Sequence, residues 1–327
     1  MKEEEIRNRE VFDQYLEMVK KDVDSFFRDH STFIKIACPA CSGTDYITQF
    51  NKSNFNYTLC NNCGTLFVNP RPPFDFLARF YTQSPSTQFW VNSFFKPVAE
   101  ARRIKIFQPR AEYVAQKFGS DHGWIVGDIG AGFGLFLEEL SKIWKGSRLI
   151  AIEPSEDMAE ICRSKTLEVL PYTMEDVKGM DGKFDLLTSF ELFEHVYDPE
   201  TFLRKSGELL RPGGRLLLTT LSGEGFDIQV LWEKSKSVSP PHHLNFFNPG
   251  SIRILMEKCG FAIEEISTPG KLDWDIVEGI IAKDTVDNGR FWNLLAGKGS
   301  DRSKEAFQNW ISEYNFSSHM RVVAVKV

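Results

Sequence analysis

The spacing of apolar residues changes along the chain, and each change predicts a different kind of structure. Within residues 1–30 the apolar side chains recur at alternating steps of four and three, which is typical of one stripe of an amphipathic helix. In the simplest interpretation this stripe packs on its own chain or on a second subunit. It consists of Phe12, Leu16, Val19, Val23 and Phe26.

Residues 31–73 alternate short β-like runs with turn residues, which is the layout of a zinc ribbon built from two knuckles joined by short strands. The runs are FIKIA, DYITQF, NYTLC and TLFVN. The segment 69–73, NPRPP, closes this module, because proline blocks both a helix and a sheet ladder. Residues 74–119 then predict a helical linker that is rich in aromatic side chains, among them Tyr81 and Trp90.

From residue 120 onward, apolar strands alternate with helical segments, as in WIVGDIGAG, LFLEELSKIW and RLIAIEP. That order predicts a parallel sheet covered by helices on both faces. We therefore expect residues 120–327 to form a doubly wound α/β domain whose last strand is MRVVAVKV. Two stretches interrupt the pattern and are expected to be insertions: 222–248, which is rich in Gly, Ser and Pro, and 271–319, which is mostly helical and polar.

Four of the six cysteines form two Cys-x-x-Cys pairs, Cys38 with Cys41 and Cys60 with Cys63. Each pair places two thiolates at the tip of a tight turn, and two facing tips supply the four soft ligands of a tetrahedral zinc site. The spacing therefore predicts structural Zn²⁺; two redox motifs or four buried thiols are the alternatives. A closed four-cysteine site has no position for water or substrate, so its expected role is to hold a small module together.

Charge limits the classes of function. Lys and Arg number 39 against 45 Asp and Glu, a net charge of −6, which argues against broad electrostatic binding to nucleic acid or an anionic membrane. No apolar run reaches the ~18 residues of a membrane helix. The acidic start MKEEEIRNRE lacks the apolar core of a secretory signal, so a cytoplasmic location is expected. Basic residues gather in 96–117, either as a solvated helix face or as an anion-binding wall.

The segment 128–134, DIGAGFG, follows one strand and opens a helix. In a doubly wound fold the ligand lies at the carboxyl ends of the strands, and glycines allow the backbone to approach it without a Cβ in the way. Asp128 is then able to receive an ammonium group. Glu153 ends the next strand, where its carboxylate can accept both hydroxyls of a ribose. A Rossmann dehydrogenase is the main rival, but it requires a further glycine where this chain has Leu135.

The glycine segment, the acid after the second strand and the later stretches FDLL, FEHV and LLRPGG together resemble class I S-adenosylmethionine-dependent methyltransferases. The resemblance covers about 120–265 and the last strand, and it implies a Rossmann-like sheet with an antiparallel final strand. The N-terminal cysteine module followed by NPRP resembles bacterial methyltransferases associated with sugars and surface polysaccharides.

The resemblance also implies a set of cofactor contacts. The glycine turn holds the methionine part of the cofactor, Glu153 binds the ribose, and the loop after the third strand flanks the adenine. Tyr81 is expected to cover the cofactor, with linker-helix core as the alternative. The remaining cofactor-binding positions are Asp128, Gly130, Ala131, Gly132, Gly134, Pro154, Met174, Glu175, Asp176, Phe190 and Glu191.

Methyl transfer to a hydroxyl or a carbon also needs a base, and imidazole titrates near neutral pH. The candidates are His195 after the fourth strand, and His242 and His243 at the end of the irregular 222–241 stretch. Of this pair, His243 matches a histidine of the sugar C-methyltransferases. His195 has an equal alternative role in orienting its loop by a hydrogen bond.

The sequence therefore predicts a methyltransferase of a small molecule, with a sugar nucleotide or a surface-glycan precursor favoured. A phosphate-bearing acceptor would meet the basic stretch 96–117. An RNA methyltransferase that uses the ribbon to bind RNA is the first alternative, and a non-catalytic zinc-ribbon interaction protein is the second. The intact Asp128, Gly130, Gly132 and Glu153 argue against a mere scaffold, which has no use for a cofactor pocket.

Overall fold

A computed structural model describes residues 2–119, 123–283 and 289–327. The chain forms two compact units, each assembled from separate segments. The ribbon unit comprises residues 1–97, 220–252 and 267–321, and the sheet unit comprises residues 98–219, 253–266 and 322–327. Residues 120–122 and 284–288, which fall within the expected methyltransferase domain, lie outside the described residues.

The sheet unit is built on seven strands in the order β10-β11-β8-β7-β4-β5-β6, with an antiparallel final strand. The four pairings among β4, β5, β6, β7 and β8 are parallel. This confirms the expected α/β Rossmann-like fold. The strands are β4 (Ile125–Ile129), β5 (Arg148–Ile152), β6 (Glu168–Leu170), β7 (Phe184–Phe190), β8 (Leu210–Leu221), β10 (Phe261–Ser267) and β11 (His319–Lys326).

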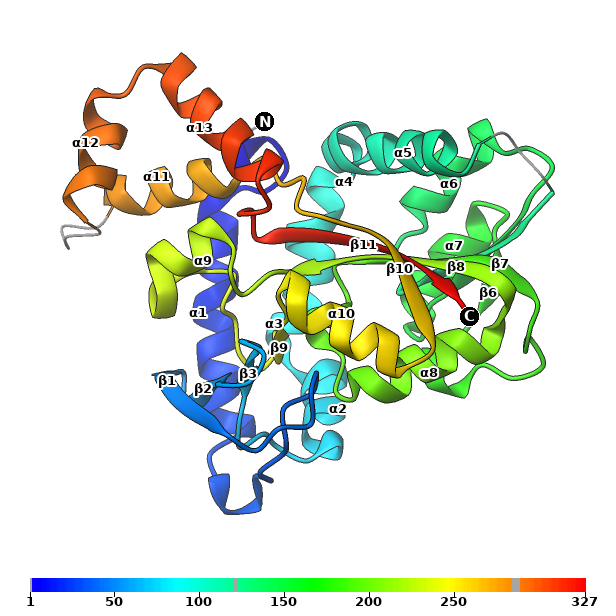
Figure 1. Ribbon diagram of the computed structural model, residues 1–327, viewed down its shortest axis with the longest axis horizontal. Coiled ribbons are helices and arrows are strands. Elements are labelled where there is room, and N and C mark those ends of the chain that lie inside the picture. The colour runs from blue at the N-terminus through cyan, green and yellow to red at the C-terminus, as the bar shows by residue number, and fades with distance from the viewer. Residues whose placement is uncertain (1, 120–122, 284–288) are drawn as a thin grey trace. The chain divides into compact units, whose positions relative to one another are not determined.

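Helices cover both faces of this sheet, as its apolar strands require. Figure 1 shows α5 and α6 on one face and α8 on the other. Val114, Val126, Phe136 and Leu186 belong to one buried cluster that joins α5, α6 and the strands. The helices are α4 (Lys96–Arg102), a π-helical turn (Arg103–Phe107), α5 (Gln108–Phe118), α6 (Leu135–Ile143), α7 (Glu156–Ser164), α8 (Pro199–Leu209) and α10 (Pro249–Lys258).

The ribbon unit holds a second, four-stranded sheet in the order β1-β2-β3-β9. Its strands are β1 (Tyr46–Lys52), β2 (Phe55–Cys60), β3 (Leu66–Val68) and β9 (Asn245–Phe246), and all three pairings are antiparallel. Its helices are α1 (Arg9–Phe26), α2 (Phe74–Gln83), α3 (Pro85–Phe89), α9 (Phe226–Leu231), α11 (Asp273–Lys283), α12 (Arg290–Lys298) and α13 (Asp301–Glu313), with a π-helical turn at Trp90–Phe95.

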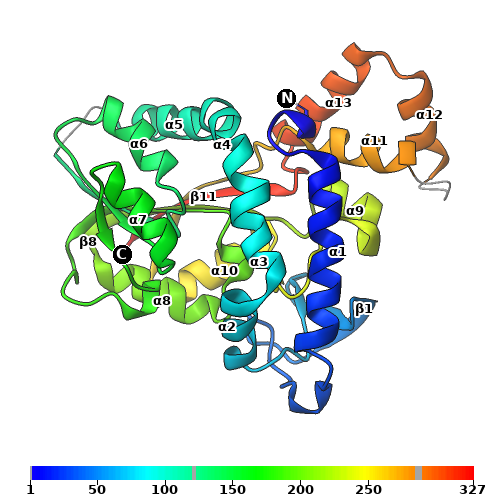
Figure 2. The ribbon, with the colours of Figure 1, turned by 180° about the vertical axis from the view of Figure 1, so that it is seen from behind.

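The amphipathic stripe of the N-terminus packs on its own chain. Asn8 caps α1 by accepting a hydrogen bond from the Val11 amide at 3.1 Å. Phe12, Val19 and Val23 are buried, and α1 runs beside α3 (Figure 2). The helix therefore buries its apolar face within the ribbon unit.

The stretch 222–248 is more ordered than its composition indicates. It contains α9, a 3₁₀ turn at Trp232–Lys234 and β9. Strand β9 pairs Asn245 with Phe67 and Phe246 with Leu66. Two residues are too few to show a strand pattern, and their partners lie far away in sequence, so nothing local predicts this strand. Among the residues that the structure describes, no helix is both long and apolar enough to cross a bilayer.

Candidate functional site

The carboxyl ends of β4 and β5 bring the glycine turn and two acids together. The Gly130 amide donates to the Ile152 carbonyl at 2.8 Å, which ties the turn to the neighbouring strand. Gly132 has a φ of +55°, and a Cβ built on it meets no heavy atom of the described residues within 4 Å. A Cβ built on Gly134 would clash with Cys162 and Leu167, so Gly134 allows these side chains to pack closely on the turn. Among the described residues, the space next to the Gly132 Cα is therefore open.

Glu153 is buried beside that space and is held in one orientation. Its Oε2 accepts from the Gly132 amide at 2.8 Å, and its Oε1 accepts from the Ser155 amide at 2.9 Å. Burial raises the pKa of Glu153, while these two hydrogen bonds act in the opposite direction. Each oxygen keeps further lone pairs with which to accept hydroxyl groups.

Asp128 is the second buried acid of this edge. Its Oδ1 accepts from the Thr188 hydroxyl at 2.7 Å. Burial raises the pKa of Asp128 to about 7, although the Thr188 hydrogen bond and the charge of Arg110 lower it. A cation placed against Asp128 therefore stabilises its ionised form at neutral pH.

Arg110, on α5, supplies the positive charge of the site. Its guanidinium lies 3.3 Å from Glu191 Oε1 and 4.7 Å from the centre of the Phe190 ring. Glu191 also accepts from the Thr219 hydroxyl at 2.6 Å and has a φ of +53°, a strained conformation that is common at functional sites. The sequence placed Arg110 only within the basic stretch 96–117.

Three basic residues of that stretch, Arg103, Arg110 and Lys117, pair with carboxylates. Arg103 contacts Glu138 and Glu139 at 2.8 Å, and Lys117 contacts Glu265 at 2.6 Å. The side chain of Lys96 lies outside the described residues. Arg103 and Lys117 thus connect elements of the sheet unit to one another.

The other predicted cofactor positions differ in exposure. Met174 is buried in a 3₁₀ turn, Met174–Asp176, whereas Glu175 and Asp176 are exposed. Pro154 is exposed, and Ala131 and Phe190 are half-buried. His195 ends a second 3₁₀ turn, Phe193–His195, which follows β7.

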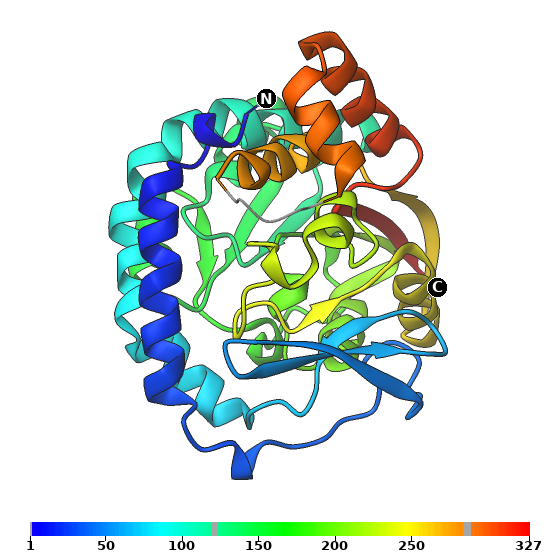
Figure 3. The same cartoon turned by 90° about the vertical axis from the view of Figure 1, so that its left-hand side faces the viewer.

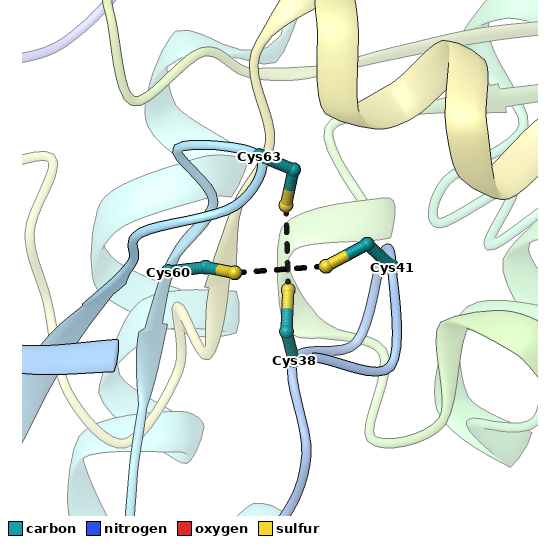
Figure 4. A group of neighbouring side chains, drawn as sticks. All are labelled: Cys38, Cys41, Cys60 and Cys63. Atoms are coloured by element: carbon teal, nitrogen blue, oxygen red, sulfur yellow. Dashed lines mark hydrogen bonds between the residues drawn. The ribbon is translucent and has the colours of Figure 1, made fainter. Parts of the chain in front are cut away.

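The four predicted metal ligands lie together in the ribbon unit (Figure 4). Cys38 Sγ is 3.5 Å from Cys63 Sγ, and Cys41 Sγ is 3.6 Å from Cys60 Sγ. Zn–S bonds of about 2.3 Å in a tetrahedron place sulfurs about 3.8 Å apart, so the cluster fits a zinc ion. The hydrogen bond between Cys38 and Cys63 lowers the pKa of Cys63 and raises that of Cys38.

His242 and His243 lie in the ribbon unit in different surroundings. His242 is buried, with its Nε2 3.0 Å from the Tyr15 hydroxyl and its ring 5.1 Å from that of Phe80. Burial lowers the pKa of His242 to about 3. The Tyr81 hydroxyl donates to the His242 carbonyl at 3.3 Å. Tyr81 therefore lies against His242, and its predicted role in covering the cofactor stays a prediction.

His243 is held as a single tautomer. Its Nδ1 lies 2.5 Å from the Ser237 carbonyl oxygen, which only accepts hydrogen bonds, so Nδ1 carries the proton. In the neutral ring the lone pair is then on Nε2. The His243 carbonyl accepts from the Tyr57 hydroxyl at 2.9 Å, which fixes the backbone as well.

Comparison with known proteins identifies the sheet unit. Residues 102–266, half of the chain, match the family described as a methyltransferase domain. The chain belongs to this methyltransferase family. It is an S-adenosylmethionine-dependent methyltransferase, and its fold and the acids around Gly132 agree with that activity.

Similar methyltransferases include curated proteins and a solved structure. The ubiquinone biosynthesis O-methyltransferase of Xanthomonas axonopodis pv. citri is 29% identical over 48% of this chain and 70% of its own length. That of Xanthomonas oryzae pv. oryzae is 28% identical over the same shares. The methyltransferase solved with the Haloferax volcanii Trm112 activator is 19% identical, with a TM-score of 0.50 over 72% of this chain and 96% of its own. This last likeness concerns the fold.

Gly132→Ala tests whether the open space belongs to the cofactor. The new Cβ meets no described protein atom, so folding is expected to lose only about 1–2 kcal/mol for the left-handed backbone. We expect calorimetry to show at least a tenfold loss of S-adenosylmethionine affinity. Gly179→Ala is the matched control, because Gly179 has a φ of +72° and equally open surroundings among the described residues. Equal affinities for the two variants would contradict the assignment.

The pKa of Asp128 predicts a pH-dependent affinity. Below pH 7 the cofactor's ammonium group meets a protonated Asp128, so binding must expel that proton. The affinity for S-adenosylmethionine is expected to fall about fivefold from pH 7 to pH 6 and to level off above pH 8. Asp128→Asn should bind weakly at every pH without this slope. A flat profile in the unsubstituted protein would refute the role of Asp128.

Proposed function

We propose that this methyltransferase transfers the methyl group of S-adenosylmethionine to a hydroxyl of a small-molecule acceptor, with His243 as the base. The observation that carries the cofactor assignment is the open position at Gly132, whose amide donates to the buried Glu153, together with the buried Asp128 at the end of β4. The tautomer of His243 supports its assignment as the base. His195 is the second candidate for that role.

The charges of the sheet unit support a specific orientation of the cofactor. Glu153 accepts the two ribose hydroxyls, because both of its oxygens are already aimed by backbone amides. Asp128 receives the ammonium group of the methionine part. We assign the methionine carboxylate to Arg110, whose positive charge also interacts with Glu191, Asp128 and Glu194.

The remaining predicted cofactor positions surround this arrangement. Met174 contacts the adenine from its buried position, and the exposed Asp176 and Glu175 accept its amino group. Ala131, Pro154 and Phe190 border the nucleoside and the glycine turn, and Tyr81 covers the cofactor. The family resemblance and the positions of these residues support these roles.

The reaction is an in-line displacement in which the chain orients the acceptor and removes a proton. Bound S-adenosylmethionine supplies an electrophilic methyl group and leaves as S-adenosylhomocysteine. His243 Nε2 takes the hydroxyl proton as the O–CH₃ bond forms. The Ser237 carbonyl keeps its hydrogen bond to Nδ1–H and stabilises the resulting imidazolium. His242 is a poor base, because burial lowers its pKa to about 3. Its proposed role is to hold the segment that contains His243 in place through its contact with Tyr15.

Two lines of evidence bear on the acceptor class. The names of the similar Xanthomonas proteins favour O-methylation of a small hydroxylated molecule. The cysteine module followed by NPRP favours a sugar nucleotide or another precursor in polysaccharide biosynthesis. Both are small molecules with hydroxyl groups, which is the class we propose. The RNA alternative remains the competing hypothesis for the same cofactor site.

We also propose that the four cysteines bind structural Zn²⁺. Their sulfur spacing supports a closed tetrahedral site. When bound, the metal supplies four strong bonds to a module with a small core. Metal analysis is expected to find one zinc per chain, and Cys60→Ser should lose it.

The acceptor class is tested with methyl-labelled S-adenosylmethionine. The zinc-loaded protein is incubated with cell extract separated into small-molecule, RNA, protein and glycolipid pools. Label in the small-molecule or glycolipid pool is the expected result. Label confined to RNA would overturn the small-molecule proposal and make the ribbon a recognition module.

The base is tested in the same assay with two histidine variants. In His243→Asn the amide can still donate to Ser237, so the loop is kept while the base is removed. Labelling is expected to fall about 10²–10⁴-fold, with the affinity for S-adenosylmethionine unchanged. His195→Asn is the comparison. If His195→Asn abolishes labelling and His243→Asn does not, the base is His195.

A further inference from the structure

We propose that the metal site of the ribbon unit positions the histidine loop, residues 239–248, for the acceptor reaction. This inference rests on the proposed roles of Zn²⁺ and His243. It assigns the metal a task beyond holding its own module together, namely control of the acceptor side of catalysis.

The histidine loop ends as a strand of the ribbon sheet. Strand β9 pairs with β3 through Leu66 with Phe246 and Phe67 with Asn245, and the Val68 amide donates to the Leu244 carbonyl at 2.9 Å. Figure 3 shows the strands β1–β3 in blue with the yellow segment that contains β9 beside them. The first residue of β9 follows His243 by two positions, so the histidine's backbone is set by the ribbon sheet.

Three further hydrogen bonds join the ribbon to the loop, two from ribbon side chains and one from a loop side chain. Tyr57, on β2, donates to the His243 carbonyl at 2.9 Å from a fully buried position. Arg71, which is also buried, donates to Asn245 Oδ1 at 3.0 Å. Asn248 in turn donates to the Cys63 carbonyl at 2.9 Å. The last of these joins the loop directly to a metal-binding knuckle.

The metal cluster controls the strands that make these bonds. Cys60 is the last residue of β2, and its amide bonds to the Thr65 carbonyl just before β3. The turn between β2 and β3 therefore contains the second cysteine pair. The sulfurs of Cys38 and Cys41 contact this pair from the other knuckle. A zinc ion fixes this turn, and with it the strand on which β9 is paired.

Without metal, only weak contacts between thiol groups join the two cysteine pairs, whose sulfurs lie within 4.8 Å of one another. Small modules of this type lose their fold without the ion, because their apolar core is too small. We therefore expect metal loss to loosen β3 and to release β9 and His243. The sheet unit has its own apolar core and its own cofactor residues, so its binding of S-adenosylmethionine is preserved.

Hydrogen exchange followed by mass spectrometry tests this coupling in the full chain. The zinc-loaded protein is compared with protein stripped by a strong chelator, and Zn²⁺ alone is then added back. Amides of 242–248 are expected to exchange at least about tenfold faster without metal and to recover on addition. Amides of β4 and β5 are expected to be unchanged. Unchanged exchange at 242–248, or equal acceleration in β4 and β5, would overturn the proposal.

Tyr57→Phe breaks the coupling without touching a cysteine. It removes one hydrogen bond to the His243 carbonyl and keeps the ring. We expect about three- to tenfold faster exchange at 242–248 and a similar drop in label transfer, with zinc content and cofactor affinity unchanged. Asn51→Ala is the matched control, because it removes a hydrogen bond within the same ribbon, to Asn56, that lies away from the loop. Equal effects of the two variants would contradict the proposal.

Failure of the proposed function gives a different result. If the zinc-loaded protein does not bind S-adenosylmethionine, the cofactor assignment fails, whatever the exchange data show. If the cofactor binds and 242–248 remains protected without metal, only the coupling fails.

Discussion

The burial of two carboxylates at the carboxyl edge of the sheet is the constraint on which the site depends. A buried acid must be hydrogen-bonded or paired with positive charge, because desolvation penalises its ionised form. Glu153 meets this requirement through two backbone amides, and Asp128 through Thr188 and the charge of Arg110. The pKa of Asp128 is raised to about 7, so Thr188 and Arg110 offset only part of the cost of burying its charge. In the proposed site the cationic cofactor would supply the missing positive charge beside Asp128.

The two units divide the chemistry between them in this account. The sheet unit contains the groups assigned to the cofactor, and the ribbon unit contains the histidine loop assigned to the acceptor. The ribbon sheet includes β9, so the small metal module and the acceptor loop share one set of backbone hydrogen bonds. In the proposed coupling, a zinc ion with no open coordination position would affect catalysis through these backbone hydrogen bonds.

Local patterns in the sequence predicted the features that have local causes. The alternation of strands and helices predicted the parallel sheet. The four-and-three spacing of apolar residues predicted α1, and the two Cys-x-x-Cys pairs predicted the cysteine cluster. The sequence could not single out Arg110 from its basic neighbours, because its pairing with Glu191 joins residues far apart in the chain. In the sequence Thr188 and Thr219 are ordinary strand residues. Only the strand register shows that their hydroxyls donate to Asp128 and Glu191. Strand β9 was missed because its partner lies in the ribbon. The roles of the individual site residues stay predictions.

A crystal structure of the zinc-loaded chain with S-adenosylhomocysteine tests the central claim most directly. The account predicts both ribose hydroxyls on Glu153, the methionine ammonium group on Asp128, its carboxylate on Arg110, and ligand atoms directly over Gly132. A nucleoside bound away from Glu153, with the space above Gly132 unused, would contradict it.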